Sequence, residues 1–491
     1  MWVPAFALKV NTNYKSAACI GISDNAFQKE NPADSSTGSF RIGKVYLEGQ
    51  KRTRERVIIR ELELGANQLV RCKDSAAFFA REANKVFNTR LFVFVTVHTV
   101  NYVPGLDTAT PGTADVVVNM KERWYTFPYP ILELADRSFN EWWYNRNHDF
   151  SRINFGGFVT QNNLTGNKDP LIVKVQGGFT QKLELTYSFP YINKRLNEGL
   201  RTGVTYATTR NLAFGTGLDA VQGPDKQSFL KAENLLRKRL IAFLGYTLRR
   251  GYYRTHTIDL LFNRTTVSDT IAERNPNYFL NGKTSQTYSQ LEYNYRLDRR
   301  NIRYYPLSGY MFDIEAEQLG LLPSDDVHIS SARIGYSHFE PLGHNFFYAG
   351  RAEAGFSTPR RQPYSVTRGL GYGGRYVRGY DAYIIDGPTT LLLKNTLRKR
   401  VFSKVLTIPH MPIHQFAKMP LDIYFKVFID QGYVNSPFAN SENRLPNKWL
   451  IGGGLGVDIV TFYDAVIRFE YSANRQDPRQ PQLFFYLTTD I

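Results

Sequence analysis

Residues 171–189 read LIVKVQGGFTQKLELTYSF, and their side chains alternate between apolar and polar along most of this length. Leu183, Leu185 and Tyr187 occupy one set of alternate positions, and Lys182 and Glu184 occupy the other. Because successive side chains of a strand point to opposite faces, this period of two predicts β-strands with one apolar and one polar face. The same alternation returns at residues 290–297 and 467–472, close to the end of the chain.

Such strands fit two architectures. In a soluble sandwich the apolar face packs inward, whereas in a membrane barrel it faces lipid and the polar face lines a wet lumen. Periodicity alone does not separate them, but length helps. About 340 residues follow residue 150, and at roughly 20 residues per strand with its connection they predict about sixteen strands. A soluble domain of this size built only of long amphipathic strands would be unusual, so we expect a mainly β protein, a transmembrane antiparallel β-barrel.

The composition excludes some other classes. The 491 residues contain no run of the ~18 to 20 apolar residues that a membrane-spanning helix needs. Aromatic residues make up 14% of the chain, which suits the two aromatic girdles of a membrane barrel or an aromatic-rich soluble β protein. The net charge is +17, but Lys and Arg are spread along the alternating segments without a nucleic-acid motif. We therefore expect no nucleic-acid partner.

The sequence offers little chemistry. Cys19 and Cys72, the only two cysteines, lie in different segments, so we expect neither a disulfide framework nor a zinc cluster. No Gly-x-Ser-x-Gly elbow is present. We expect no catalytic residues, no metal site, no cofactor and no enzymatic activity.

The first third of the chain has a different pattern. Residues 1–39 are interpreted as a linker, with a signal that is truncated or removed. Residues 40–124 then contain a strand at 40–47, two helix candidates, and strands at 92–100 and 114–120. This order, β-α-α-β-β, predicts a small α+β domain with a three-stranded sheet and an open edge.

The stretch 125–150 is interpreted as a transition segment. Its clustered aromatic residues, which include Trp142 and Trp143, are typical of a chain that enters a membrane interface or of a hydrophobic interdomain contact. The barrel is expected to begin after it and to occupy residues 151–491.

Several motifs are similar to those of the BamA/TamA superfamily, a group of outer-membrane protein insertases and translocators. They are a mid-barrel signature, a loop motif and a strand motif, in this order: Asp298, Pro306 and Gly309; Val377, Arg378, Gly379 and Tyr380; Phe428, Asp430 and Gly432. The small domain at 40–124 resembles a POTRA domain. The resemblance covers residues 40–491 and implies a bacterial surface antigen barrel with one POTRA-like domain.

In that family, the loop that bears the motif folds back into the barrel, and its Arg meets the strand that bears the Asp. The resemblance therefore implies that Arg378 pairs with Asp430. The local pattern agrees, because Lys426 and Phe428 share one strand face with Asp430 and Val427 falls on the other. A charge-assisted pair at this place would hold the loop.

The resemblance implies an outer-membrane protein that assists insertion, assembly or translocation of other proteins, with its N-terminal domain in the periplasm. The POTRA-like edge strand is expected to capture clients, and the barrel seam to template client strands. We place that seam between a first strand at 152–161, weakened by Gly156 and Gly157, and a last strand at 482–490. A dedicated exporter of one partner protein is the alternative, and a passive diffusion pore is a further one.

The expected partners are outer-membrane lipid or lipopolysaccharide, unfolded outer-membrane or secreted clients, and periplasmic accessory proteins. Two features depart from the family pattern. Only one POTRA-like domain is visible, and the chain ends at Ile491 instead of the terminal Phe common in these barrels. Both departures leave the range of clients open.

Overall fold

The computed structural model describes residues 38–105, 110–134, 148–210, 212–218, 227–232, 236–381, 383–407, 418–437, 443–461, 465–476 and 482–489. The chain divides into two compact units. Unit 1 comprises Met1–Tyr125 and Asn162–Asp169, and unit 2 comprises Thr126–Gln161 and Pro170–Ile491. No helix within the described stretches is long and apolar enough to cross a membrane.

Unit 1 is a small α+β fold with a four-stranded sheet in the order β2-β1-β4-β3. Its elements are β1 (Ser39–Glu48), α1 (Glu55–Ile59), β2 (Leu69–Arg71), α2 (Cys72–Phe87), β3 (Phe92–Val103) and β4 (Gly112–Glu122). β1 and β4 are parallel, and the other pairs are antiparallel. The sheet has one strand more than we expected, because β2 is only three residues long and is too short to show an alternating pattern.

The core of unit 1 forms where α2 packs on the sheet. Phe40 and Ile42 of β1, Val116 of β4 and Phe79 of α2 are all buried in one cluster. α2 is amphipathic, so its buried face is held by packing against the sheet. Residues 162–169 complete the unit through hydrogen bonds to residues 52–54.

The expectation for the cysteines was wrong. Cys72, at the start of α2, is disulfide-bonded. The sequence contains one other cysteine, Cys19, which lies outside the described residues. Spacing along the chain did not reveal the bond, because a disulfide depends on distance in the fold and not on sequence separation.

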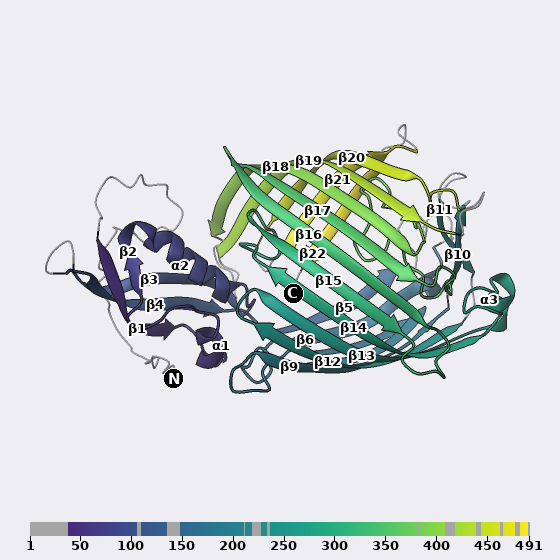
Figure 1. The fold of residues 1–491 in the computed structure, drawn as a ribbon, viewed down its shortest axis with the longest axis horizontal. Helices are drawn as coiled ribbons and strands as arrows, with labels where there is room; N and C mark the ends of the chain where they lie inside the picture. Colours follow the sequence, from purple (N-terminus) through teal and green to yellow (C-terminus); the bar gives the residue numbers. More distant parts are fainter. Residues whose placement is uncertain are drawn as a thin grey trace. The chain divides into compact units, whose positions relative to one another are not determined.

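Unit 2 is a sixteen-stranded antiparallel sheet that curves into a barrel wall (Figure 1). Its strands, in sheet order, are β5 (Thr126–Leu134), β6 (Ile153–Gln161), β7 (Leu171–Gly178), β8 (Thr180–Phe189), β9 (Glu198–Thr209), β12 (Arg237–Arg250), β13 (Arg254–Val267), β14 (Ser285–Asp298), β15 (Gly309–Leu319), β16 (Ile329–Gly343), β17 (Phe346–Thr358), β18 (Thr389–Thr407), β19 (Lys418–Asn435), β20 (Trp449–Val460), β21 (Ala465–Asn474) and β22 (Gln482–Thr489). The mainly β fold and the sixteen strands expected from the sequence are confirmed.

Four further elements of the described part of unit 2 lie outside this sheet. They are η2 (Phe150–Arg152), α3 (Asp269–Arg274) and the two strands of a separate hairpin, β10 (Leu212–Leu218) and β11 (Gln227–Ala232). The hairpin is inserted in the connection from β9 to β12, which pair with each other directly.

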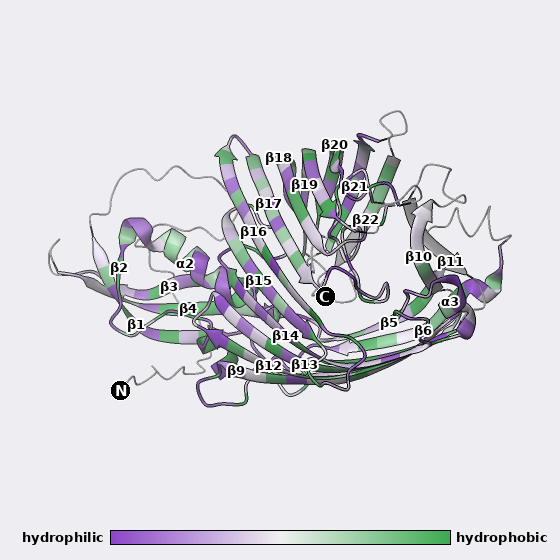
Figure 2. Cartoon of the chain, turned by 45° about the vertical axis from the view of Figure 1, so that its right-hand side comes forward, coloured by the Kyte–Doolittle hydropathy of each residue, from purple (hydrophilic) through white to green (hydrophobic). Residues whose placement is uncertain are grey.

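The alternation of the sequence becomes two faces of the wall, and Figure 2 shows it as bands of hydropathy along the strands. On β19, Lys426 and Phe428 are 4% and 6% exposed, whereas Val427 and Ile429 are 55% and 51% exposed. The apolar face is therefore the outer one, and charged side chains are buried inside. This is the arrangement of a membrane barrel and the opposite of a soluble sandwich.

The sheet begins one strand earlier than we expected. Its first strand is β5, which lies in the stretch that we interpreted as a transition segment. Gly156 and Gly157 lie in β6, the second strand, where they face Ile131 and Pro130 of β5. The seam assignment for these two glycines was therefore wrong. Two prolines in β5 hide it from sequence patterns, because proline within a run argues against a strand.

Candidate functional site

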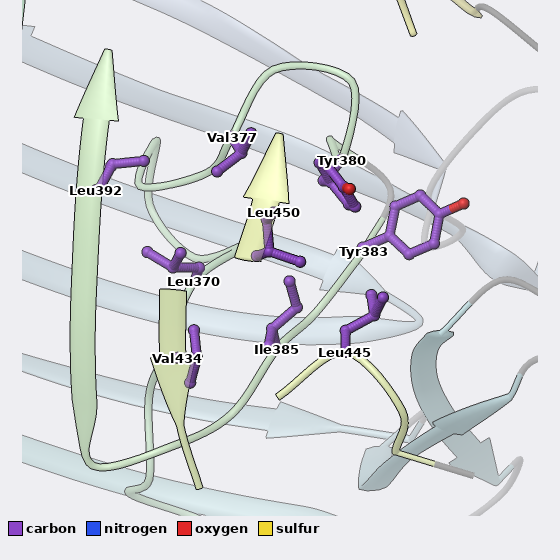
Figure 3. Packing of buried hydrophobic residues seen from close by; sticks show 9 residues of the cluster. All are labelled: Leu370, Val377, Tyr380, Tyr383, Ile385, Leu392, Val434, Leu445 and Leu450. Atoms are coloured by element: carbon purple, nitrogen blue, oxygen red, sulfur yellow. The ribbon is translucent and has the colours of Figure 1, made fainter. Parts of the chain in front are cut away.

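The connection from β17 to β18, described at residues 359–381 and 383–388, folds against the interior face of the sheet. Leu370 and Ile385 exchange backbone hydrogen bonds of 2.9 and 3.0 Å, which close the loop on itself. Figure 3 shows the apolar cluster that this loop forms with β18, β19, β20 and the segment just before β20. The cluster consists of Leu370, Val377, Tyr380, Tyr383, Ile385, Leu392, Val434, Leu445 and Leu450.

Arg378, at the tip of the loop motif, is bound to Asp430 of β19. Its Nε and Nη2 donate to the two carboxylate oxygens at 2.7 and 2.6 Å, and its backbone N–H donates to the same carboxylate at 3.1 Å. Nη2 also donates to Thr396 Oγ1 at 2.9 Å. The guanidinium lies 3.9 Å from the centre of the Phe428 ring, which places it in cation–π contact.

Two glycines make room for this loop. A Cβ on Gly432 would lie 2.6 Å from Val377 Cγ2, and a Cβ on Gly452 of β20 would lie 2.0 Å from the Arg378 carbonyl oxygen. Gly379 has a φ of +94°, a conformation that favours glycine. Its carbonyl accepts a hydrogen bond from Asn474 Nδ2 at 2.7 Å. The loop can therefore reach the wall only because these positions lack side chains.

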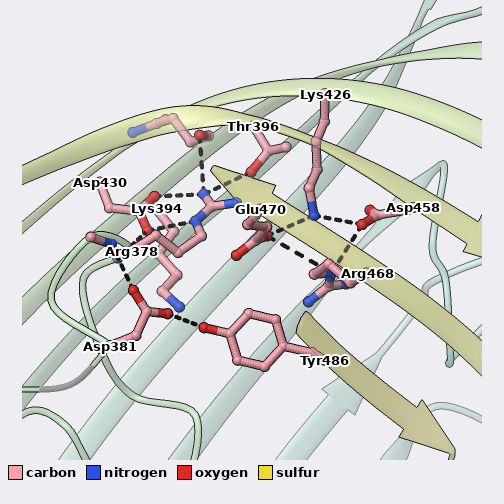
Figure 4. Close-up of polar contacts among 12 residues, drawn as sticks. Arg378, Asp381, Lys394, Thr396, Lys426, Asp430, Asp458, Arg468, Glu470 and Tyr486 are labelled. Atoms are coloured by element: carbon pink, nitrogen blue, oxygen red, sulfur yellow. Dashed lines mark hydrogen bonds and ion pairs between the residues drawn. The ribbon is translucent and has the colours of Figure 1, made fainter. Parts of the chain in front are cut away.

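A second set of buried charges continues the site (Figure 4). Lys426 Nζ donates to Asp458 Oδ1 at 2.5 Å and to Glu470 Oε1 at 2.6 Å. Arg468 Nε donates to Asp458 at 3.1 Å. Glu470 also lies 3.8 Å from Arg378 Nη1, so the two sets are connected. Every carboxylate here has a cationic partner, as burial requires.

The connection between β14 and β15 reaches the same network from the other end of the strands. Asp298 accepts two hydrogen bonds from the Arg300 guanidinium, at 2.8 and 2.7 Å. Gly309 has a φ of +94°, and a Cβ there would lie 2.1 Å from the Arg299 carbonyl oxygen. This turn contains Tyr305, whose hydroxyl donates to Asp458 at 2.9 Å.

Pro306 lies beside Tyr305 in this turn, and its carbonyl oxygen accepts a hydrogen bond from Arg398 Nη1 at 3.2 Å. The Arg398 guanidinium also lies 4.5 Å from the centre of the Tyr305 ring. β18, which carries Arg398, therefore holds the turn against the interior wall.

The loop motif also contacts the last strand. Asp381 accepts hydrogen bonds from the backbone N–H of Gly379, at 2.7 Å, and from the hydroxyl of Tyr486 on β22. Tyr376 stacks on Tyr486 with 6.3 Å between ring centres. Burial raises the pKa of the Asp381 carboxyl. The interior face of β22 is thus fixed to the loop.

A further buried carboxylate ties the base of the loop to the β10–β11 hairpin. Asp386 accepts hydrogen bonds from Thr216 of β10 and from Tyr372 of the loop. Burial raises the pKa of the Asp386 carboxyl, and Tyr364, which lies close to Thr216, has a pKa that burial raises as well.

The structure thus brings together the loop motif and the strand motif, and places the mid-barrel signature in a turn that contacts the same network through Tyr305. Gly156 and Gly157 lie apart from it in β6. Sequence reasoning missed Gly452, Asp458 and Glu470. The glycine run at 452–454 was the one local signal, because a strand interior rarely holds several glycines without a close backbone approach.

Within the described ranges, no group of three or more His, Cys, Asp or Glu residues is placed to hold a metal ion. The sequence does contain one His-x-x-x-His spacing, from His410 to His414, which lies outside those ranges.

Residues 163–488, about two thirds of the chain, match the Omp85 superfamily domain. The chain belongs to the Omp85 superfamily. The resemblance inferred from the motifs is confirmed, and this Omp85 protein is an outer-membrane β-barrel of a family that acts in protein insertion and transport. No curated protein matches its sequence significantly.

Solved structures similar to this Omp85 protein share little sequence with it. BamA from Haemophilus ducreyi lacking POTRA domains 1-3 is 13% identical, with a TM-score of 0.49, over 91% of this chain and 84% of that one. CdiB from Escherichia coli is 11% identical, with a TM-score of 0.48, over 94% and 92%. CdiB from Acinetobacter baumannii is 13% identical, with a TM-score of 0.46, over 91% and 73%.

Proposed function

We propose that this Omp85 protein assists the insertion or assembly of other proteins in the outer membrane and is not an enzyme. The observation that carries the proposal is the interior loop, which is held by the buried Arg378–Asp430 pair and fills the space beside β18, β19 and β20. A loop that is fixed by buried charges obstructs the lumen and can organise the wall around the seam. Insertion itself needs no chemistry, because a client gains free energy by placing apolar side chains in lipid and pairing its backbone groups.

We assign client capture to the N-terminal unit, which we propose to lie in the periplasm. β3 is twelve residues long and, among the described residues, has one neighbouring strand in its sheet, so the structure describes no strand that pairs with its other edge. Extended segments bind such edges by adding a strand. Unfolded outer-membrane or secreted proteins, outer-membrane lipid or lipopolysaccharide, and periplasmic accessory proteins are the proposed partners.

Two other functions remain as alternatives with distinct expectations. A dedicated exporter would pass one partner protein through the lumen and would accelerate the folding of no unrelated client. A passive pore needs an open lumen, which the buried loop opposes.

The test is assisted folding. The full chain is placed in liposomes, an unfolded outer-membrane barrel protein is added, and the client's protease protection and heat-modifiable gel mobility are followed over time. We expect faster client folding with the wild type than with empty liposomes, and loss of that gain with Arg378→Ala. Equal rates in wild-type and empty liposomes would reject the general insertase in favour of the dedicated exporter.

A further inference from the structure

The outer face of the barrel sheet carries two positive charges at one end of β12 and β13. Leu240 of β12 and Leu260 of β13 are exposed on this face, whereas Asn263 of β13 is buried on the interior side. Because side chains alternate along a strand, the even-numbered residues of both strands point outward. Lys238 and Arg264 therefore project from the outer face, and both are exposed.

Lys238 and Arg264 are close enough to act on one ligand. In the ladder, Lys238 is opposite Thr266 and Arg264 is opposite Leu240, so the two cations are diagonal neighbours on one face. Such neighbours lie about 7–8 Å apart, and long side chains bridge that distance. Within the ranges that the structure describes, neither side chain has an ion pair or a hydrogen bond. Along the described lengths of β12, β13 and β14, no outward position holds an acidic residue, so the two charges are uncompensated.

An apolar hollow of about 560 Å³ lies on the same face of the same strands. Ala242 of β12 accounts for it, because this small side chain stands between two larger register partners, Val204 of β9 and Phe262 of β13. Its volume falls within the range of small-molecule sites, roughly 300 to 1,000 Å³. Lys238 lies two outward positions further along β12, about 13 Å from Ala242. A hollow with apolar walls and a cationic rim suits a ligand with an acyl chain and an anionic head.

The charges lie at the end of the sheet opposite to the connection between β6 and β7. That connection, residues 162–169, belongs to unit 1. Successive strands of the sheet run in opposite directions, so the start of β12 and the end of β13 fall at the other end. If unit 1 is periplasmic, this end of the barrel reaches the outer leaflet of the outer membrane.

The depth of the two cations agrees with the position of lipid head groups. On β12, the outward residues between Lys238 and Arg250 are Leu240, Ala242, Leu244, Tyr246 and Leu248. The stretch from Lys238 to Arg250 spans about 40 Å along the strand and, at a tilt of about 40°, about 30 Å across the membrane. This is the thickness of a hydrocarbon core. Lys238 therefore lies at one membrane interface and Arg250 at the other.

We propose that Lys238 and Arg264 bind a phosphate group of lipopolysaccharide, and that the hollow at Ala242 receives one of its acyl chains. Lysine and arginine bind phosphate through charge-assisted hydrogen bonds, which match the two uncompensated cations. The assignment to the outer leaflet rests on the proposed function, because it takes from it the periplasmic placement of unit 1. The ligand is thus a phosphorylated glycolipid with several acyl chains.

The experiment measures lipid binding to the folded full chain in detergent. Lipopolysaccharide, dephosphorylated lipopolysaccharide and phosphatidylglycerol are added in turn, and the bound lipid is counted by native mass spectrometry. We expect lipopolysaccharide to bind about tenfold more tightly than either of the other two lipids. Lys238→Gln/Arg264→Gln should lose about tenfold in affinity for it. Ala242→Phe, which fills the hollow, should lose about fivefold.

Each variant has a matched control on the same outer face. Arg250→Gln/Arg254→Gln removes two outward charges from the other end of the same two strands, where these residues are opposite each other. Ala354→Phe adds the same ring to β17, outside the hollow. Both controls should stay within about twofold of the wild type. Heat-modifiable gel mobility of each variant shows that its barrel has folded.

Several results would overturn the proposal. They are equal losses in the two double variants, unchanged affinity in Ala242→Phe, and phosphatidylglycerol or dephosphorylated lipopolysaccharide that binds as tightly as lipopolysaccharide. Cleavage of unit 1 by protease added to intact cells would overturn the assignment to the outer leaflet. Client folding in liposomes is followed separately. Selective binding of lipopolysaccharide without faster client folding would refute the insertase function and leave this lipid site in place.

Discussion

The carboxylate of Asp430 is fully buried and receives three hydrogen bonds from Arg378. Its neighbour on the same strand face, Lys426, is buried between Asp458 and Glu470. Charges buried to this extent are stable only beside a partner of opposite charge, so each pair acts as a unit. The loss of one partner leaves an uncompensated charge, and the loss of both does not.

This coupling predicts how much stability the barrel loses when one or both partners are replaced. Arg378→Ala should destabilise the barrel by about 3 to 5 kcal/mol, because Asp430 is left buried without its cation. The double variant Arg378→Ala/Asp430→Asn should lose clearly less, since no charge is stranded. Both free energies of unfolding are measured by urea unfolding of each variant in liposomes, with the folded fraction read from gel mobility. The coupling would be contradicted if the stability lost in the double variant equalled the sum of the losses in Arg378→Ala and Asp430→Asn alone.

At the scale of the element, the loop 359–388 carries two carboxyl groups whose pKa is raised by burial, Asp381 and Asp386. The unfolded value of such a group is about 3.9. Between that value and the raised folded value, the folded loop binds more protons than the unfolded one. Its free energy of opening therefore falls as pH rises through this window and increases on acidification.

We predict that hydrogen exchange in this loop, corrected for the intrinsic pH dependence, is slower in acid than near neutral pH. Asp386→Asn should reduce this dependence, and Asp381→Asn/Asp386→Asn should abolish it. An unchanged pH profile in the double variant would show that other groups control the opening.

Strands and loops were not equally predictable from the sequence. The faces of β19 followed from alternation alone, because a period of two assigns each side chain to a face before any partner is known. The Arg378–Asp430 contact followed only from the family resemblance. Asp458 and Glu470 could not be assigned, because their partner Lys426 is 32 and 44 residues away and meets them only in this register. β5 was missed because proline within a run argues against a strand, and its two prolines are compatible with a strand only at the edge of a sheet.

At the scale of the whole molecule, the interior loop should keep the barrel closed to ions. Gly452→Ala places a Cβ 2.0 Å from the Arg378 carbonyl oxygen, so it should displace the loop and raise the single-channel conductance in a planar bilayer several-fold. Gly157→Ala is the matched control. Its Cβ would meet only the Tyr129 carbonyl oxygen, at 3.5 Å, an ordinary contact. Similar conductance of the two variants would show that the loop does not seal the lumen.

The N-terminal unit contains a segment from far along the chain, residues 162–169. Asn163 is fully buried and donates to Thr53 Oγ1 at 3.0 Å, and the Gly166 carbonyl accepts from Arg54 N–H at 3.0 Å. During synthesis this unit therefore cannot be completed until β5 and β6 have left the ribosome. For the same reason, a domain exchanged between relatives by cutting after Tyr125 would arrive without its last piece.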